Sequence, residues 1–204
     1  MIAGVLAMVA RLIAGGTARW VESLPEDRQR VYFANHSSHL DFVLVWAALP
    51  PGARRRTRPV AARDYWDRGA IRRYLAAKVF RAVLVERTGG GDAAERGRAA
   101  VARMAEGMGT SDSLILFPEG TRGTGGRLAP FRSGLYHLAR ERPGLELVPV
   151  HIENLNRVLP KGEFIPVPMI SRITFGATMH LEDGESKEEF LERARKAVES
   201  LRAR

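Results

Sequence analysis

The chain has 204 residues, enough for a single domain with one substantial core, and 45% of them are hydrophobic. It contains no cysteine, which excludes disulfides, zinc–thiolate sites and cysteine nucleophiles. The net charge of +9 indicates a polyanionic partner, either nucleic acid or an anionic membrane surface, or it partly reflects an arginine-rich composition, since only four of the 32 basic residues are lysines. Charge alone does not choose between these.

The first fourteen residues are apolar except for Arg11. At about 1.5 Å rise per residue they cover only about two thirds of a bilayer core, so a transmembrane span is not expected. No positive segment precedes them, so they do not fit a secretory signal. Two interpretations remain, a helix buried against the domain or a helix lying in the membrane interface. We expect residues 1–20 to be membrane-interfacial and residues 21–204 to form the folded domain.

Short apolar runs alternate with helical patterns along the rest of the chain. The runs that indicate strands lie at 31–34, 59–62, 82–85, 114–117, 147–152 and, more weakly, 173–176. The helical patterns lie at 42–49, 71–80, 92–108, 133–140 and 186–204. This alternation predicts a single α/β domain: a central sheet, mostly parallel or mixed, flanked by helices, with a short apolar N-terminal helix.

A histidine and a carboxylate lie five residues apart, where the first strand is followed by a helix. On one continuous helix His36 and Asp41 would be roughly 140° apart, because each residue turns about 100°. They can meet only if His36 lies in the turn and Asp41 in the first helical turn, where the helix dipole also favours a carboxylate. The spacing therefore predicts a base and its orienting acid.

Polar residues follow other strands too. Arg63, Arg87 and the segment Glu119–Gly120–Thr121–Arg122 each come after an expected strand. In open α/β sheets, ligands bind beyond the carboxyl ends of the strands. Glycine lets a backbone approach a ligand closely, and guanidinium binds phosphate bidentately. The strand end at residues 120–122 therefore predicts an anion-binding site.

Three further features leave alternatives. The basic run Arg54, Arg55, Arg56 and Arg58 is either a solvated loop face or an anionic-lipid contact. His36 and His39 have a spacing that suits a metal pair on one helical face, but no further ligand set stands out, so no metal is expected. A nucleic-acid partner would need exposed aromatic stacking or a recognition motif, and neither is found, so none is expected.

Five motifs occur in chain order: NHSSHLD, VER, FPEGTR, FRSG and VPVHI. Together they resemble the glycerolipid acyltransferases of the lysophosphatidate acyltransferase type, over residues 31–178. The resemblance implies that residues 21–204 are an acyltransferase domain with His36 as general base and Asp41 as its orienting partner. It places the acceptor phosphate near the residues Arg63, Arg87, Gly120, Thr121 and Arg122, with Glu119 holding that site together. Arg63 stands where such enzymes often carry a lysine.

The resemblance also implies a reaction. A fatty acyl group would move from acyl-CoA or acyl carrier protein to the free hydroxyl of a lysophospholipid, by default 1-acyl-sn-glycerol-3-phosphate, without a cofactor. A neutral imidazole suits removal of the hydroxyl proton. The implied place is the cytoplasmic face of the cell membrane, as a peripheral or monotopic protein on an anionic surface. The alternatives are acylation of another lyso-lipid or of glycerol 3-phosphate, and a non-catalytic basic lipid- or nucleic-acid-binding protein.

Overall fold

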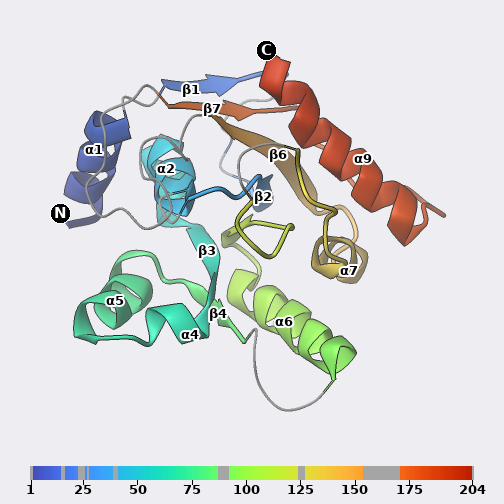
Figure 1. Ribbon diagram of the computed structural model, residues 1–204, viewed down its shortest axis with the longest axis horizontal. Helices are drawn as coiled ribbons and strands as arrows, with labels where there is room; N and C mark the ends of the chain where they lie inside the picture. The colour runs from blue at the N-terminus through green and yellow to red at the C-terminus, as the bar shows by residue number, and fades with distance from the viewer. Residues whose placement is uncertain are drawn as a thin grey trace.

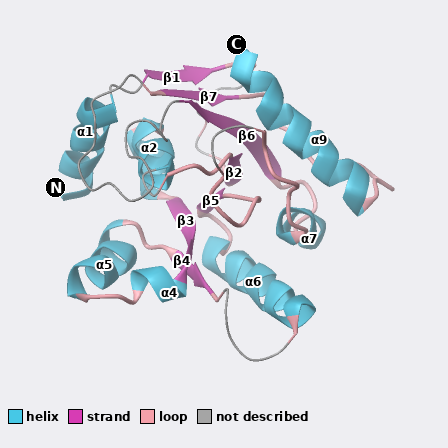
Figure 2. Cartoon of the chain, in the orientation of Figure 1, coloured by secondary structure: helices cyan, strands magenta, loops and turns pink. Residues whose placement is uncertain are grey.

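The computed structural model of the protein describes residues 2–14, 17–22, 26, 28–38, 41–86, 92–123, 127–153 and 171–203. At its centre lies a seven-stranded sheet in the order β1-β7-β6-β2-β5-β3-β4 (Figures 1 and 2). The strands are β1 (Thr17–Trp20), β2 (Arg30–Ala34), β3 (Thr57–Ala62), β4 (Val83–Val85), β5 (Ser113–Leu116), β6 (Glu146–Glu153) and β7 (Arg172–Phe175). Every pairing between these strands is parallel except that of β6 with β7, so the expected mixed α/β sheet is confirmed.

Helices cover both faces of this sheet (Figure 1). The first face carries α1 (Ile2–Ala14), α2 (Asp41–Ala48), α3 (Pro51–Arg55), α4 (Arg63–Trp66) and the π-helical turn η1 (Leu75–Val79). The short helix α5 (Ala70–Tyr74) runs directly into η1. The second face carries α6 (Ala93–Met108), α7 (Gly134–Glu141) and α9 (Lys187–Ser200), which ends in the 3-10 turn η2 (Leu201–Ala203).

Strand β2 shows why an unbroken apolar run is needed at the centre. Successive side chains of a strand point to opposite faces, so a strand covered on both faces needs apolar side chains on both of them. Val31 and Phe33 pack into the core beneath α6, α7 and α9, whereas Tyr32 and Ala34 pack into the core beneath α2. Because β2 lies between β6 and β5, the residues that follow it emerge at the middle of the sheet's carboxyl edge.

All six strands expected from the sequence form, each within two residues of its expected limits. Strand β1 was not expected: it is a four-residue edge strand, three of its residues are exposed, and it has no apolar run. The single helix expected at 71–80 is wrong, because the segment divides into α5 and the wider turn η1. There the N–H of Phe80 donates to the carbonyl of Leu75, five residues back.

Helix α1 packs on the domain through one side and exposes apolar side chains on the other. Ala7 is buried in the core that α2 also joins, whereas Val5, Met8 and Val9 are exposed. Its thirteen residues correspond to roughly 20 Å of helix, against about 30 Å of bilayer core. Among the described residues, no helix is long and apolar enough to span a membrane.

Candidate active site

The histidine–carboxylate pair forms at the carboxyl end of β2. His36 Nδ1 lies 2.7 Å from Asp41 Oδ2, and Asp41 is the first residue of α2 and fully buried. The same oxygen accepts hydrogen bonds from the backbone N–H groups of Ser37, at 2.6 Å, and Ser38, at 2.9 Å. The turn thus holds the carboxylate through backbone donors, and the carboxylate holds the imidazole.

This geometry determines the tautomer of His36. An ionised carboxylate only accepts hydrogen bonds, so Nδ1 of the neutral imidazole carries the proton and Nε2 keeps its lone pair. The ring also stacks on Phe117, with ring centroids 4.3 Å apart and planes inclined by 21°. The side chain of His36 remains 22% exposed. It is therefore held in one orientation, with Nε2 as the basic nitrogen.

Glu119 connects the turn that carries His36 to the loop after β5. Its Oε1 accepts the backbone N–H of His36 at 2.8 Å, and its Oε2 accepts the backbone N–H of Ala129 at 3.0 Å. The N–H of Gly123 in turn donates to the carbonyl of His36 at 2.8 Å. Glu119 is buried, so both of its oxygens are engaged by backbone donors away from water. The loop therefore contacts both sides of the His36 peptide unit.

The turn after Glu119 is shaped by a glycine. Gly120 has a φ of +70°, and a Cβ there would overlap the side chain of Arg132. Arg132 Nε donates to the carbonyl of Glu119 at 3.3 Å. Thr121 and Arg122 follow and are exposed. The N–H of Gly120 already donates to the carbonyl of Phe117.

Arg63 lies at the same edge of the sheet, at the end of β3. Strands β2 and β3 both neighbour β5, which places them two strand spacings of about 4.8 Å apart. Arg63 Nε is 3.6 Å from Glu86 Oε1, and within the described residues this nitrogen makes no hydrogen bond. Arg63 and Glu86 border a cleft of about 210 Å³ against α6, lined also by Leu84, Glu95, Arg96, Ala99, Ala100 and Arg103. The sequence candidates Arg87 and His39 lie outside the described residues.

Two contacts at the site were missed from the sequence. Asn35 pairs with the backbone of Ile152: its Nδ2 donates to the carbonyl at 2.9 Å, and its Oδ1 accepts the N–H at 2.7 Å. The amide thus continues the β2–β6 pairing by one residue and aligns the start of the turn. The second missed contact is the stacking of Phe117 on His36. The sequence signal for both was position within a motif, because Asn35 precedes His36 in NHSSHLD and Phe117 begins FPEGTR.

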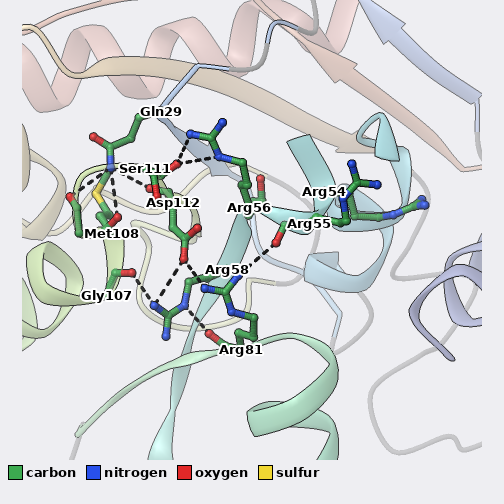
Figure 3. Close-up of polar contacts among 12 residues, drawn as sticks. Gln29, Arg54, Arg55, Arg56, Arg58, Arg81, Gly107, Met108, Ser111 and Asp112 are labelled. Atoms are coloured by element: carbon green, nitrogen blue, oxygen red, sulfur yellow. Dashed lines mark hydrogen bonds and ion pairs between the residues drawn. The ribbon is translucent and has the colours of Figure 1, made fainter. Parts of the chain in front are cut away.

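The basic run at 54–58 is largely engaged within the protein (Figure 3). Arg56 donates through Nε and a terminal nitrogen to the carbonyl of Ser111, and Arg58 donates to the carbonyls of Arg81 and Gly107. The guanidinium of Arg54 lies 5.4 Å from the ring centroid of Trp46. These side chains fasten β3 and its neighbours to the end of α6.

The electrostatics of this cluster agree with its inward orientation. Burial and the neighbouring Arg81 lower the pKa of Arg58 from its ordinary value, and the carboxylate of Asp112 partly opposes them. Asp112 lies 2.6 Å from Arg81 and 3.7 Å from Arg58. The run is therefore a structural network, with Arg55 as its exposed member.

The fold and the site define an α/β protein with a histidine at the carboxyl edge of the parallel strands of a mixed sheet, oriented by a buried carboxylate. A family profile described as acyltransferase matches residues 18–153, two thirds of the chain. The chain therefore belongs to the glycerolipid acyltransferase family, as the motifs indicated, and the relatives it matches are of the lysophosphatidate acyltransferase type.

Two relatives illustrate the likeness. A 1-acyl-sn-glycerol-3-phosphate acyltransferase of Limnanthes douglasii is 32% identical over 169 residues, covering 77% of this chain and 56% of the relative. The human protein named 1-acyl-sn-glycerol-3-phosphate acyltransferase alpha is 30% identical over 122 residues, covering 59% of this chain and 40% of the relative. The chain thus spans about half the length of these relatives.

The fold has a solved counterpart. The crystal structure of the 1-acyl-sn-glycerophosphate acyltransferase PlsC from Thermotoga maritima superposes with a TM-score of 0.73. The match covers 100% of this chain and 79% of that one, at 20% identity. At this level of identity the comparison shows the shared fold.

Proposed function

We propose that this protein transfers a fatty acyl group from an acyl thioester, acyl-CoA or acyl carrier protein, to the free hydroxyl of 1-acyl-sn-glycerol-3-phosphate. The observation that carries the proposal is the pair formed by His36 and Asp41, whose 2.7 Å contact leaves Nε2 of the imidazole as a base. The names of the relatives support the choice of acceptor.

The reaction needs one base and no covalent enzyme intermediate. The acceptor hydroxyl oxygen attacks the thioester carbonyl carbon while its proton passes to His36 Nε2, and the carboxylate of Asp41 stabilises the imidazolium that forms. The tetrahedral intermediate collapses with cleavage of the carbon–sulfur bond. The thiolate leaves and takes the proton from His36, which restores the neutral imidazole.

The acceptor's phosphate has cationic partners at the same edge. Two arginines are suited to an anionic headgroup. Arg63 has a buried Nε that makes no hydrogen bond among the described residues, and Arg122 is exposed. Thr121 adds a hydroxyl between Gly120 and Arg122. We assign these residues, together with Arg87, to acceptor binding, and Glu119 to holding the loop that carries them.

Helix α1 is proposed to bring this site to its lipid substrate. It packs on the domain through one side and exposes Val5, Met8 and Val9, spaced for one helical face, on the other. A helix of this kind lies in the plane of a membrane interface. The protein would then be peripheral or monotopic at the cytoplasmic face of an anionic membrane.

The test offers purified protein a panel of lyso-lipids and glycerol 3-phosphate with acyl-CoA or acyl carrier protein, read by mass spectrometry. Wild type should acylate 1-acyl-sn-glycerol-3-phosphate. His36→Ala and Asp41→Asn should lose about 10³-fold or more in kcat. The matched control is His137→Ala, because His137 is an exposed histidine on α7. Full activity in His36→Ala refutes the mechanism, and acylation of no acceptor by wild type refutes the function.

A further inference from the structure

The exposed large apolar side chains are distributed unevenly over the molecule. In the part of the chain that the structure describes, they are Val5, Met8, Val9, Ile71 and Tyr74, and all lie on α1 and α5. Helix α1 and the segment around α5 pack on the same core, beneath the first face of the sheet, and lie on the same side of the molecule (Figure 1). Apolar surface gathered on one side of a soluble domain marks a contact with a partner or a membrane.

The exposed apolar residues on α5 belong to a segment that projects from the domain. We call residues 67–78 the α5 projection. Residues 67–74 are all exposed, and Ile71 reaches 78% and Tyr74 50% exposure. Trp66, just before the projection, and Ala76, within its last turn, are buried in the core, so the exposed stretch 67–74 is anchored on both sides. Because Ile71 and Tyr74 are three residues apart on one helix, they share a face.

Basic residues flank this apolar pair in the sequence. The α5 projection holds Arg68, Arg72, Arg73 and Lys78 against the single acidic residue Asp67, a net charge of +3. The three arginines and the lysine are all exposed. Arg68 Nε donates to the carbonyl of Asp64 at 3.1 Å, and the guanidinium of Arg72 lies 4.5 Å from the ring centroid of Tyr65. In the run at 54–58, Arg56 and Arg58 are less exposed and donate to backbone carbonyls (Figure 3).

We propose that the α5 projection is a second membrane contact, which inserts Ile71 and Tyr74 into the interface of an anionic phospholipid bilayer while its basic residues meet the headgroups. Apolar side chains rimmed by arginine and lysine suit that surface, because insertion and charge attraction add. The inference extends the proposed contact of α1. Two separate contacts on one side determine the orientation of the domain, whereas a single helix leaves it free to roll about the helix axis.

The absence of native cysteine allows a direct test. Single-cysteine variants Met8→Cys, Ile71→Cys and Arg98→Cys carry an environment-sensitive fluorophore at α1, at the projection and at exposed Arg98 on the opposite face. The vesicles are phosphatidylcholine alone or mixed in equal parts with phosphatidylglycerol. We expect a blue shift at positions 8 and 71 with the mixed vesicles and none at 98. A shift at 8 without one at 71 overturns this inference alone, and no shift at either position overturns both membrane contacts.

Other binding partners of the α5 projection would give different results in the fluorescence experiment. A shift at position 71 that grows with protein concentration without vesicles indicates a second copy of the chain and overturns the bilayer contact. An equal shift with neutral vesicles overturns the role of the basic residues.

Vesicle sedimentation measures the size of the effect. Ile71→Ser/Tyr74→Ser should lower the partition coefficient by about tenfold or more, and Arg72→Gln/Arg73→Gln by about fivefold per arginine. The charge-matched control, Arg98→Gln/Arg140→Gln on α6 and α7, should stay within about twofold of wild type. Unchanged partitioning of both projection variants refutes the proposal.

Catalysis separates this inference from the proposed function. Acyl transfer to a lyso-lipid in detergent micelles should be unchanged in Ile71→Ser/Tyr74→Ser and should fall only with vesicle substrate. If wild type binds vesicles through position 71 but acylates nothing, the function fails and the docking surface stands. Loss of micellar activity in this variant would refute a role confined to docking.

Discussion

Replacing Glu119 by glutamine removes one of two acceptors that the structure uses. Both carboxylate oxygens accept backbone N–H groups, from His36 and from Ala129, at 2.8 and 3.0 Å. Glutamine offers one oxygen and one NH₂ group, so a donor must face a donor on one side. The lost hydrogen bond to a charged group costs about 2–3 kcal/mol, because the site is buried and water cannot replace the acceptor.

That cost should be visible in the thermal midpoint. For a chain of this size, 1 kcal/mol corresponds to about 2–4 °C, so Glu119→Gln should unfold about 4–12 °C below wild type. The turn that positions His36 shifts with the lost contact, and a displacement of about 1 Å at a catalytic group costs up to about 10²-fold in kcat. Scanning calorimetry and the acyl-transfer assay measure the two effects.

The matched control is Glu141→Gln, because Glu141 is an exposed carboxylate on α7. It should change stability by no more than about 0.5 kcal/mol. If Glu119→Gln unfolds within about 1 °C of wild type and keeps its kcat, the backbone hydrogen bonds of Glu119 do not hold the site.

Three further changes probe the site and the opposite end of the sheet. Phe117→Leu removes the ring stacked on His36 and should lower kcat by about 2- to 10-fold with KM little changed; an unchanged kcat would contradict this. Gly120→Ala should cost about 1–2 kcal/mol in urea unfolding because of the φ of +70°, and wild-type stability would contradict a left-handed turn. The third change is Glu146→Gln. Burial alone would raise the pKa of Glu146, but hydrogen bonds from Arg30 and Arg28 outweigh burial and lower that pKa below its ordinary 4.5. Its stabilisation is present above that pH and is lost as the pH falls through the lowered pKa, so urea unfolding of Glu146→Gln should show less acid destabilisation than wild type.

The sequence by itself determined the features that depend on neighbouring residues. Its apolar runs predicted six strands, and its helical patterns at 92–108 and 186–204 correspond to α6 and α9. Both helices begin at a local cap, because Asp92 and Ser186 each accept the N–H of the residue three positions on. The spacing of His36 and Asp41 required a turn followed by the first turn of a helix, and that arrangement forms. Strand alternation with helices was enough to predict the carboxyl edge as the site.

Only the tertiary structure decided contacts between distant segments. Glu119 lies 83 residues from His36, and no local pattern shows that its two oxygens accept backbone N–H groups. The sequence could not decide whether the arginine run at 54–58 faces solvent, lipid or the protein, for the same reason. A guanidinium satisfies its donors equally with water, lipid or a carbonyl. Arg58 reaches Gly107, 49 residues away, only because β3 packs beside α6. Burial likewise separates Ala76, inside the core, from Ile71 five residues earlier, because exposure depends on what packs against a residue as well as on its type.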